Sequence, residues 1–174
     1  MKNKWKLILG ILGVFAIIAV LVQYKYTEED RTRIDKQVIA ISINGEIVRE
    51  INEDDIREKN SEEFIAYVRS SGKAPKKNTY KGVQLTELLD KEDLLNLEQV
   101  NVKGADSFWV ALSKEQINIK KNVYIVYEKN GEKLKDRESG GEGPYQLVIR
   151  KDPFSQYWCK YVVEVDCIYE NNWI

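Results

Sequence analysis

The stretch Val38–Ile51 reads VIAISINGEIVREI and holds two runs rich in β-branched residues. The pair Asn44-Gly45 joins the two runs. An Asn-Gly pair in this setting is the strongest short-range hairpin signal, because both turn positions tolerate a positive φ. The stretch therefore predicts a β-hairpin, and it places the start of a folded domain near Gln37.

Beyond the hairpin, short strand-like runs alternate with a few short helical patterns. Their β-branched and aromatic residues predict strands at 98–104, 106–112, 122–128, 145–150 and 157–165. Caps and apolar stripes predict short helices after Asn52, over 61–69 after Ser61, on the stripe of Leu85, Leu88 and Leu89, and at the capping-box pattern Ser113–Gln116. The sequence thus predicts an α+β domain of mostly short strands with a few short helices.

A long apolar segment precedes the hairpin. Residues 5–22 read WKLILGILGVFAIIAVLV, and no charged residue interrupts the run from Leu7 to Val22. With Trp5 and Tyr24 near its ends, the segment can cross a hydrocarbon core about 30 Å thick. A cleaved signal peptide is the alternative, but no A-x-A-like cleavage pattern follows the run. Three parts are expected: a membrane anchor at 1–24 with 5–23 in contact with lipid, a polar stalk at 25–36, and a globular domain at 37–174.

The orientation of the anchor depends on basic residues. Lys2, Lys4 and Lys6 precede the span, and four basic residues lie within 25–36, so a simple count does not favour either side. Three lysines in a six-residue tail are hard to translocate. We therefore expect a single-pass protein of the cell membrane with its C-terminal domain extracytoplasmic.

The composition excludes several classes of function. The 174 residues contain no histidine, which removes Ser-His-Asp catalysis, histidine acid–base chemistry and His-containing zinc sites. The formal net charge is −1, so the chain lacks the basic excess typical of nucleic-acid binding. With two cysteines and no C-x-x-C, a four-thiolate metal site and thioredoxin-like chemistry are excluded as well. No catalytic and no metal-ligating residue is predicted.

The two cysteines, Cys159 and Cys167, are eight positions apart. On one continuous strand they would be separated by about 26 Å, too far for a disulfide. A bond requires the chain to reverse near Asp166. A disulfide and a buried pair of free thiols are thus both open.

Five segments, taken in order, carry a resemblance to a known family. They are Tyr80–Leu89 (YKGVQLTELL), Gly104–Phe108 (GADSF), Val126–Leu134 (VYEKNGEKL), Gly140–Ile149 (GGEGPYQLVI) and Trp158–Val165 (WCKYVVEV). Their order and spacing resemble the oxidoreductase molybdopterin-binding domain of the sulfite oxidase-like family. The opening hairpin is similar to the start of that domain, so the resemblance covers roughly residues 37–168.

The resemblance implies a molybdopterin cofactor, whose molybdenum the family holds through one cysteine thiolate in the loop before the first segment. Here that loop, residues 68–75, reads VRSSGKAP and has no cysteine; Ser70 or Ser71 stands near the expected place. A hydroxyl replaces a soft thiolate poorly as a metal ligand. We therefore expect no sulfite-oxidase-type oxygen transfer, and the residues themselves predict no cofactor. Binding of the pterin phosphate, or of another small anion, is what the resemblance still implies.

Basic and hydroxyl side chains surround the pocket that the resemblance implies. The candidate anion contacts are Arg69, Ser70, Ser71, Lys73, Arg150 and Lys160. Arginine binds phosphate as a bidentate fork and lysine as a point charge. Lys160 matches a lysine of the family, and its position within 157–165 puts it on one face of the predicted strand. The plain alternative is a solvated, charge-rich surface. The glycine-rich stretch 139–144 is expected to be a loop, since no helix start follows it.

Three functions follow from these observations. The first is a membrane-anchored, non-catalytic binding or accessory module for a small anionic ligand or a membrane protein partner. The second is an active molybdopterin-dependent oxidoreductase with an unusual metal ligand. The third is a structural subunit of a membrane complex, in which aromatic side chains fill the pocket. An open basic pocket favours the first two over the third.

Overall fold

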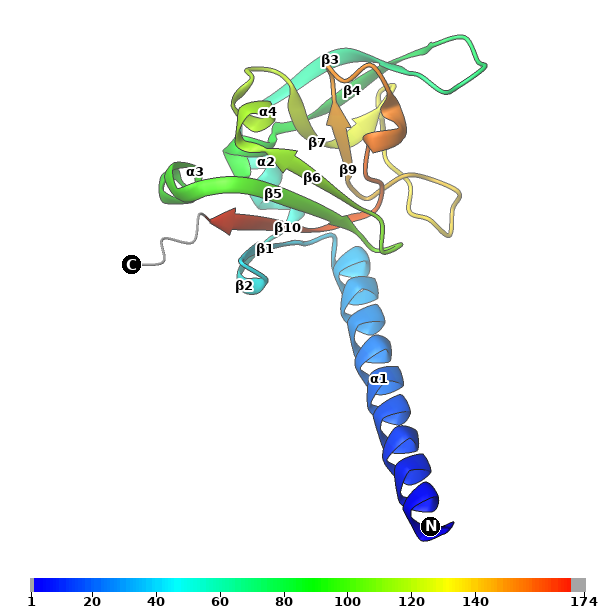
Figure 1. Cartoon of the computed structure of the whole chain (residues 1–174). Helices are drawn as coiled ribbons and strands as arrows, with labels where there is room; N and C mark the ends of the chain where they lie inside the picture. The colour runs from blue at the N-terminus through cyan, green and yellow to red at the C-terminus, as the bar shows by residue number, and fades with distance from the viewer. Residues whose placement is uncertain (1, 170–174) are drawn as a thin grey trace. The chain divides into compact units, whose positions relative to one another are not determined.

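The structure, a computed structural model, describes residues 2–169 (Figure 1). It divides into two compact units, Met1–Thr32 and Arg33–Ile174. The predicted anchor and domain include residue 1 and residues 170–174, which lie outside the described residues. The side chains of Lys2, Lys4 and Lys6, on which the predicted orientation depends, lie outside them too.

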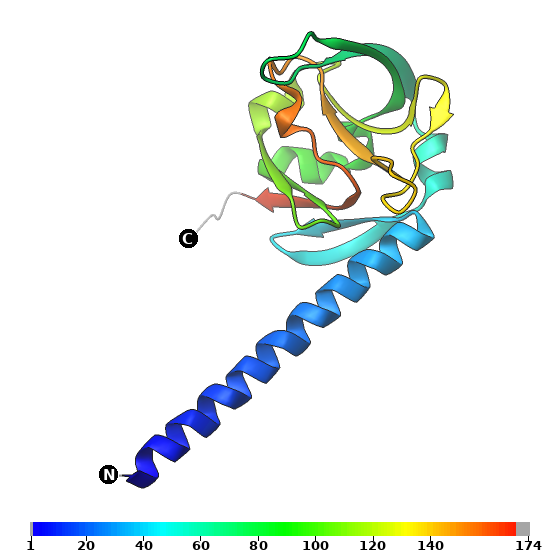
Figure 2. The same cartoon turned by 90° about the vertical axis from the view of Figure 1, so that its right-hand side faces the viewer.

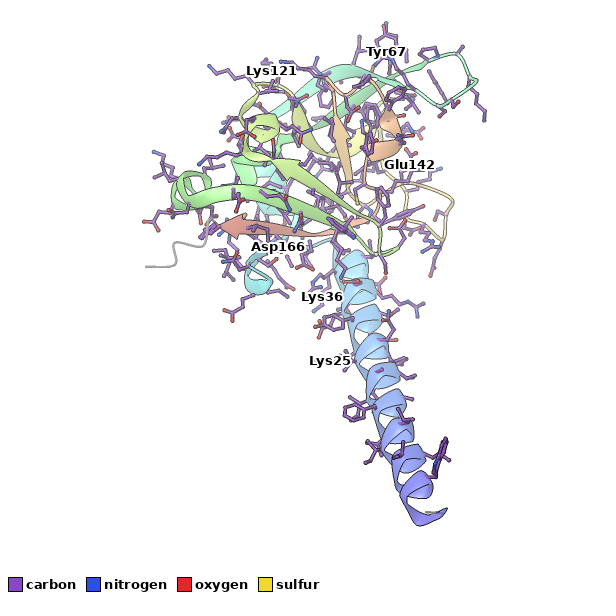
Figure 3. All side chains as sticks on the ribbon, viewed as in Figure 1. Lys25, Lys36, Tyr67, Lys121, Glu142 and Asp166 are labelled. Atoms are coloured by element: carbon purple, nitrogen blue, oxygen red, sulfur yellow. The ribbon has the colours of Figure 1, made fainter. Side chains whose placement is uncertain are left out.

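Helix α1 (Lys2–Lys36) contains the predicted anchor and continues through the predicted stalk. From Ile8 onward it is long and apolar enough to cross a membrane, a property that signal sequences near an N-terminus share. The sequence predicts only a polar stalk at 25–36, whereas the structure makes this segment helical. Lys25 and Glu29 form an ion pair at 3.7 Å across one turn, which supports a helix of charged residues (Lys25 is labelled in Figure 3).

The predicted hairpin is confirmed as β1 (Ile39–Ile43) and β2 (Glu46–Ile51). Asn44 and Gly45 have φ values of 50° and 83°, as the Asn-Gly signal requires. The N–H of Gly45 donates a hydrogen bond to Asp166 Oδ1 at 2.9 Å. The turn is therefore fixed to the last strand that the structure describes, which contains Asp166.

Among the described residues, ten strands form two sheets. The first has the order β2-β1-β10-β5-β6, with β5 (Leu97–Gly104), β6 (Trp109–Ser113) and β10 (Val162–Tyr169). In this sheet the β1–β10 pair is parallel and the other pairs are antiparallel. The second has the order β3-β4-β7-β8, with β9 also paired to β7, and consists of β3 (Ser61–Val68), β4 (Lys76–Gln84), β7 (Val123–Lys129), β8 (Glu132–Lys133) and β9 (Gln146–Ile149).

Both sheets contribute to one hydrophobic core. Ile39 and Ile41 of the first sheet and Tyr124 and Ile125 of the second are completely buried in it. Figure 2 shows hairpin β1–β2 at one end of the domain and hairpin β3–β4 at the other. The predicted mixture of helices and short strands is confirmed. The loop of the β3–β4 hairpin contributes to the cavity described below.

Short helices connect the strands. Asn52 caps α2 (Glu53–Glu58) and Ser113 caps α4 (Lys114–Asn118), each through a capping box, so both predictions are confirmed. The predicted leucine stripe is buried at Leu85, Leu88 and Leu89, but only a 3₁₀ turn, η1 (Leu85–Leu88), forms there. A separate helix, α3 (Lys91–Asn96), begins after Asp90, and a second 3₁₀ turn, η2 (Ser155–Tyr157), precedes β10.

The predicted helix over 61–69 is wrong, because this segment is strand β3. It pairs with β4 without interruption, from Ser61 opposite Val83 to Val68 opposite Lys76. Its exposure alternates: Phe64 and Ala66 are buried, whereas Ile65 and Tyr67 face solvent. Pairing with β4 and a period of two override the local helix cap.

Candidate ligand-binding cavity

A cavity of about 450 Å³ lies where the β3–β4 loop meets the segment before β10. One aliphatic residue and ten polar, charged or aromatic residues line it: Val68, Arg69, Ser70, Ser71, Glu142, Gln146, Phe154, Ser155, Gln156, Trp158 and Lys160. We call this the polar cavity. Four of the six predicted contact residues, Arg69, Ser70, Ser71 and Lys160, come together here. Their role toward a ligand remains a prediction.

The wall formed by the β3–β4 loop is fixed by a reciprocal pair of hydrogen bonds. The Arg69 N–H donates to Ser155 Oγ at 2.9 Å, and the Ser155 hydroxyl donates back to the Arg69 carbonyl at 2.8 Å. The Arg69 guanidinium lies 5.7 Å from the centre of the Tyr67 ring. Because its backbone is fixed at both polar groups, Arg69 is held at the cavity rim.

Glu142 lies on the cavity wall between two lysines. Its carboxylate pairs with Lys129 Nζ at 2.5 Å and with Lys160 Nζ at 3.1 Å. Burial pushes the pKa of Glu142 upward, but the hydrogen bonds and charges of the two lysines outweigh it and hold the pKa below its usual value. Glu142 is therefore ionised at neutral pH. Figure 3 shows it beside the helical turn η2.

The loop 139–144 positions Glu142 through two glycines, and its prediction as a loop is confirmed. The N–H of Gly141 donates to Asp136 O and that of Gly143 to Lys135 O, both at 2.8 Å. A Cβ on Gly141 would overlap the carbonyl oxygen of Lys135. Only glycine allows this close approach, so the acid between the two glycines has a defined place.

Trp158 and Gln146 complete the inner wall. Trp158 is buried, its indole N–H donates to Ile149 O at 3.2 Å, and its ring meets Tyr80 edge-on at 5.8 Å. Gln146 on β9 is 3% exposed, and its Oε1 is buried without a hydrogen-bond partner. Such an unsatisfied acceptor costs about 1–3 kcal/mol unless something donates to it.

Lys73 and Arg150 do not line the polar cavity. Lys73 is exposed in the β3–β4 loop, where its N–H donates to Ser70 O at 3.2 Å. The Arg150 guanidinium lies 4.8 Å from the centre of the Phe64 ring and donates to Lys121 O at 3.2 Å. Arg150 therefore stacks on an aromatic ring, a use of arginine that the sequence does not separate from anion binding.

Lys160 reaches the cavity by a different route from the predicted one. The expected strand 157–165 begins only at Val162 and runs on to Tyr169. Tyr161 has a positive φ of 54°, which breaks the extended conformation just before β10. Lys160 thus lies in a bend, and its pairing with Glu142 sets its direction instead of a strand face.

Seven lining residues were not among the predicted contacts, and four of them form the walls described above: Glu142, Gln146, Ser155 and Trp158. The one local signal was the acid flanked by Gly141 and Gly143, since glycines around a charged residue often mark a close backbone approach. Gln146 reads as an ordinary strand residue, and Ser155 contacts Arg69 across 86 positions. Only the fold brings them together.

Both cysteines are free and buried, so the disulfide alternative is wrong. Burial raises the pKa of each thiol to about 12, with smaller contributions from nearby aspartates. Cys159 Sγ lies 3.7 Å from Phe108 O and does not line the polar cavity, and neither does Cys167. The lining offers hydroxyl, amide, carboxylate and cationic groups but no thiolate. This donor set does not fit a molybdenum centre held by cysteine.

A second cavity of about 380 Å³ has charges that already balance. Its lining residue Arg57 pairs with Glu53 at 2.7 Å and stacks on Tyr127 at 4.5 Å, and Lys133 pairs with Glu53 at 2.6 Å. Arg57 Nη2 is buried without a hydrogen-bond partner, but the charges of Arg57 and Lys133 are both paired with Glu53, so this cavity is the weaker candidate for an anion.

A scan against protein-family models finds no match, and a search of the curated proteins finds none either. Among solved structures, the fold is similar to that of the sulfane dehydrogenase SoxCD from Paracoccus pantotrophus, with a TM-score of 0.59 and 19% identity. The match covers 76% of this chain and 38% of that chain. The chain therefore contains a mixed α and β domain with a fold related to part of SoxCD. In the sequence, this domain follows one N-terminal helix that is long enough to span a membrane.

Proposed function

We propose that the chain is a membrane-anchored, extracytoplasmic binding module whose polar cavity takes a small oxyanion without molybdenum redox chemistry. The lining of the cavity carries this proposal. Arg69, Lys160 and Glu142 all line it, which leaves one net positive charge, and the hydroxyls of Ser70 and Ser71 add donors. An oxyanion suits such a set of donors.

The proposal includes membership in the molybdopterin-binding fold family. The order of the five sequence segments and the likeness to a dehydrogenase fold support it. Gly82, which belongs to the first segment, lies against the backbone of β7 and so has a structural reason for its place. The missing thiolate favours a binding module over an active molybdenum enzyme, and a cavity of about 450 Å³ favours it over a structural subunit with a filled pocket.

The extracytoplasmic placement rests on α1 and on the lysines before its apolar run. Protease added to intact cells should cut the protein and leave a membrane-bound fragment containing α1. Protease added to lysed cells is the control, because it reaches the domain in either orientation. Protection in intact cells combined with cleavage after lysis would show the opposite orientation.

Phosphate binding tests the proposed site. We expect inorganic phosphate to bind the full-length protein in detergent, and Arg69→Gln or Lys160→Gln to weaken binding about tenfold each. Each substitution removes a charge-assisted contact worth about 1.5–3 kcal/mol, and 1.4 kcal/mol corresponds to tenfold. Calorimetric titration at constant ionic strength measures the affinity.

Lys73→Gln and Arg150→Gln are the matched controls, because each removes the same charge outside the lining. They should leave phosphate affinity within about twofold, since charges outside the binding site are screened at physiological salt. Equal losses in all four variants would show general surface attraction instead of a site. An absence of phosphate binding at millimolar concentrations would reject the proposal.

A further inference from the structure

Among the residues that line the polar cavity, Glu142 and Gln146 each carry a buried or half-buried acceptor that an anion site does not need. Glu142 is an ionised carboxylate that can only accept. Gln146 Oε1 is buried and has no partner. Arg69, Lys160, Ser70 and Ser71 supply donors around the same space. The lining residues thus combine donors for an anion with two acceptor groups, the Glu142 carboxylate and the buried Gln146 amide oxygen.

The carboxylate keeps accepting capacity despite its ion pairs. Lys129 and Lys160 bond one oxygen each, and a carboxylate has about four lone-pair sites. The reciprocal bonds between Arg69 and Ser155 fix the Arg69 backbone at the cavity. The pairing with Glu142 fixes the direction of Lys160.

An oxyanion without a proton leaves Gln146 Oε1 unsatisfied and meets the Glu142 charge directly. An oxyanion that keeps a proton can donate to one of these acceptors while its other oxygens accept from Arg69 and Lys160. A site with acceptors for a hydroxyl discriminates strongly against an analogue that lacks it. Inorganic phosphate keeps a proton at neutral pH, and sulfate does not.

We propose that the polar cavity selects oxyanions that retain a proton, of the phosphate class, over fully deprotonated ones such as sulfate. This inference rests on the proposed function and specifies its ligand. Free phosphate and a phosphate monoester share the required P–OH group. Their different titration separates them, because a monoester loses its last proton with a pKa of about 6.

Calorimetric titration of the full-length protein in detergent tests the selection. At pH 7 and constant ionic strength, inorganic phosphate should bind at least about tenfold more tightly than sulfate. Glycerol phosphate should bind more weakly at pH 8 than at pH 5.5, whereas inorganic phosphate, which keeps a proton at both pH values, should not show this loss. A monoester whose affinity holds or rises over this range would overturn the inference.

Two variants test whether Glu142 and Gln146 cause the preference for phosphate over sulfate. Glu142→Gln offers an amide that can donate, and Gln146→Met removes the buried acceptor at similar size. Each should bring phosphate and sulfate within about threefold of one another. Gln156→Met changes a lining residue that is exposed and should keep the preference. Circular dichroism confirms that each variant is folded, and an unfolded Glu142→Gln leaves Gln146→Met to decide.

The outcomes also separate this inference from the proposed function. If sulfate binds as tightly as phosphate and Arg69→Gln weakens both, the anion site stands and the selection is wrong. If neither ion binds, both are wrong. A phosphate preference that survives Glu142→Gln and Gln146→Met would likewise overturn the assigned acceptors.

Discussion

Replacing Trp158 with alanine should lower the free energy of unfolding by about 3–5 kcal/mol, the range for removing a buried tryptophan. Trp158 is only 6% exposed, contacts Tyr80 edge-on at 5.8 Å and donates its indole N–H to Ile149 O. The substitution opens a void, loses the ring contact and leaves a buried carbonyl with one bond fewer. Urea unfolding of the full chain in detergent, followed by near-ultraviolet circular dichroism, measures the change.

Trp109→Ala provides a control with the same change in side chain. Trp109 lies on edge strand β6 and is 61% exposed, so its loss should change stability by about 0.5 kcal/mol or less. The sequence treats both tryptophans as strand or packing residues, whereas the structure buries only one. Similar losses in the two variants would contradict the assigned burial.

Local signals in the sequence predicted the features that depend on few residues. Asn44-Gly45 specified a turn because both residues tolerate a positive φ. Asn52 and Ser113 specified helix starts because each capping hydrogen bond lies within three positions. The apolar run of α1 was equally clear, since length and hydrophobicity suffice to define it.

Features that depend on distant partners were predicted less well. Ser61 followed by Glu62 and Glu63 is a typical start of a helix. The segment is nevertheless a strand, because β4 pairs with it from Ser61 to Val68. The break at Tyr161 also has no local signal, because a positive φ in tyrosine depends on its surroundings. Tertiary contacts decided both cases.

The residues of the candidate site also differ in how well the sequence predicts them. Arg69, Ser70, Ser71 and Lys160 could be proposed because their positions follow from the resemblance and from their charge. Lys73 and Arg150 have the same chemistry but lie elsewhere, since the direction of a loop side chain depends on what it packs against. The acceptors of the cavity were missed because Gln146 becomes distinctive only when it is buried without a partner.

Gly82→Val should lower the free energy of unfolding by about 3 kcal/mol, at the upper end of the range for overpacking. A Cβ at Gly82 would lie 2.6 Å from Val126 Cα and closer still to Ile125 O. These are backbone atoms of β7, so no side-chain rotation can relieve the clash. The two central strands of the second sheet must then separate, and β3 and β4 move away from the core. Thermal unfolding monitored by circular dichroism measures the loss.

Gly131→Ala separates this steric effect from the general cost of replacing a glycine. Gly131 has a φ of 82°, and a Cβ at this position would meet no atom within 4 Å. Only backbone strain of about 1–2 kcal/mol therefore opposes the change. A loss for Gly82→Val no larger than that for Gly131→Ala would show that β4 and β7 lie farther apart than the structure has them. A clearly larger loss assigns the glycine of the first segment to strand pairing, a role that it has whether or not the cavity binds a cofactor.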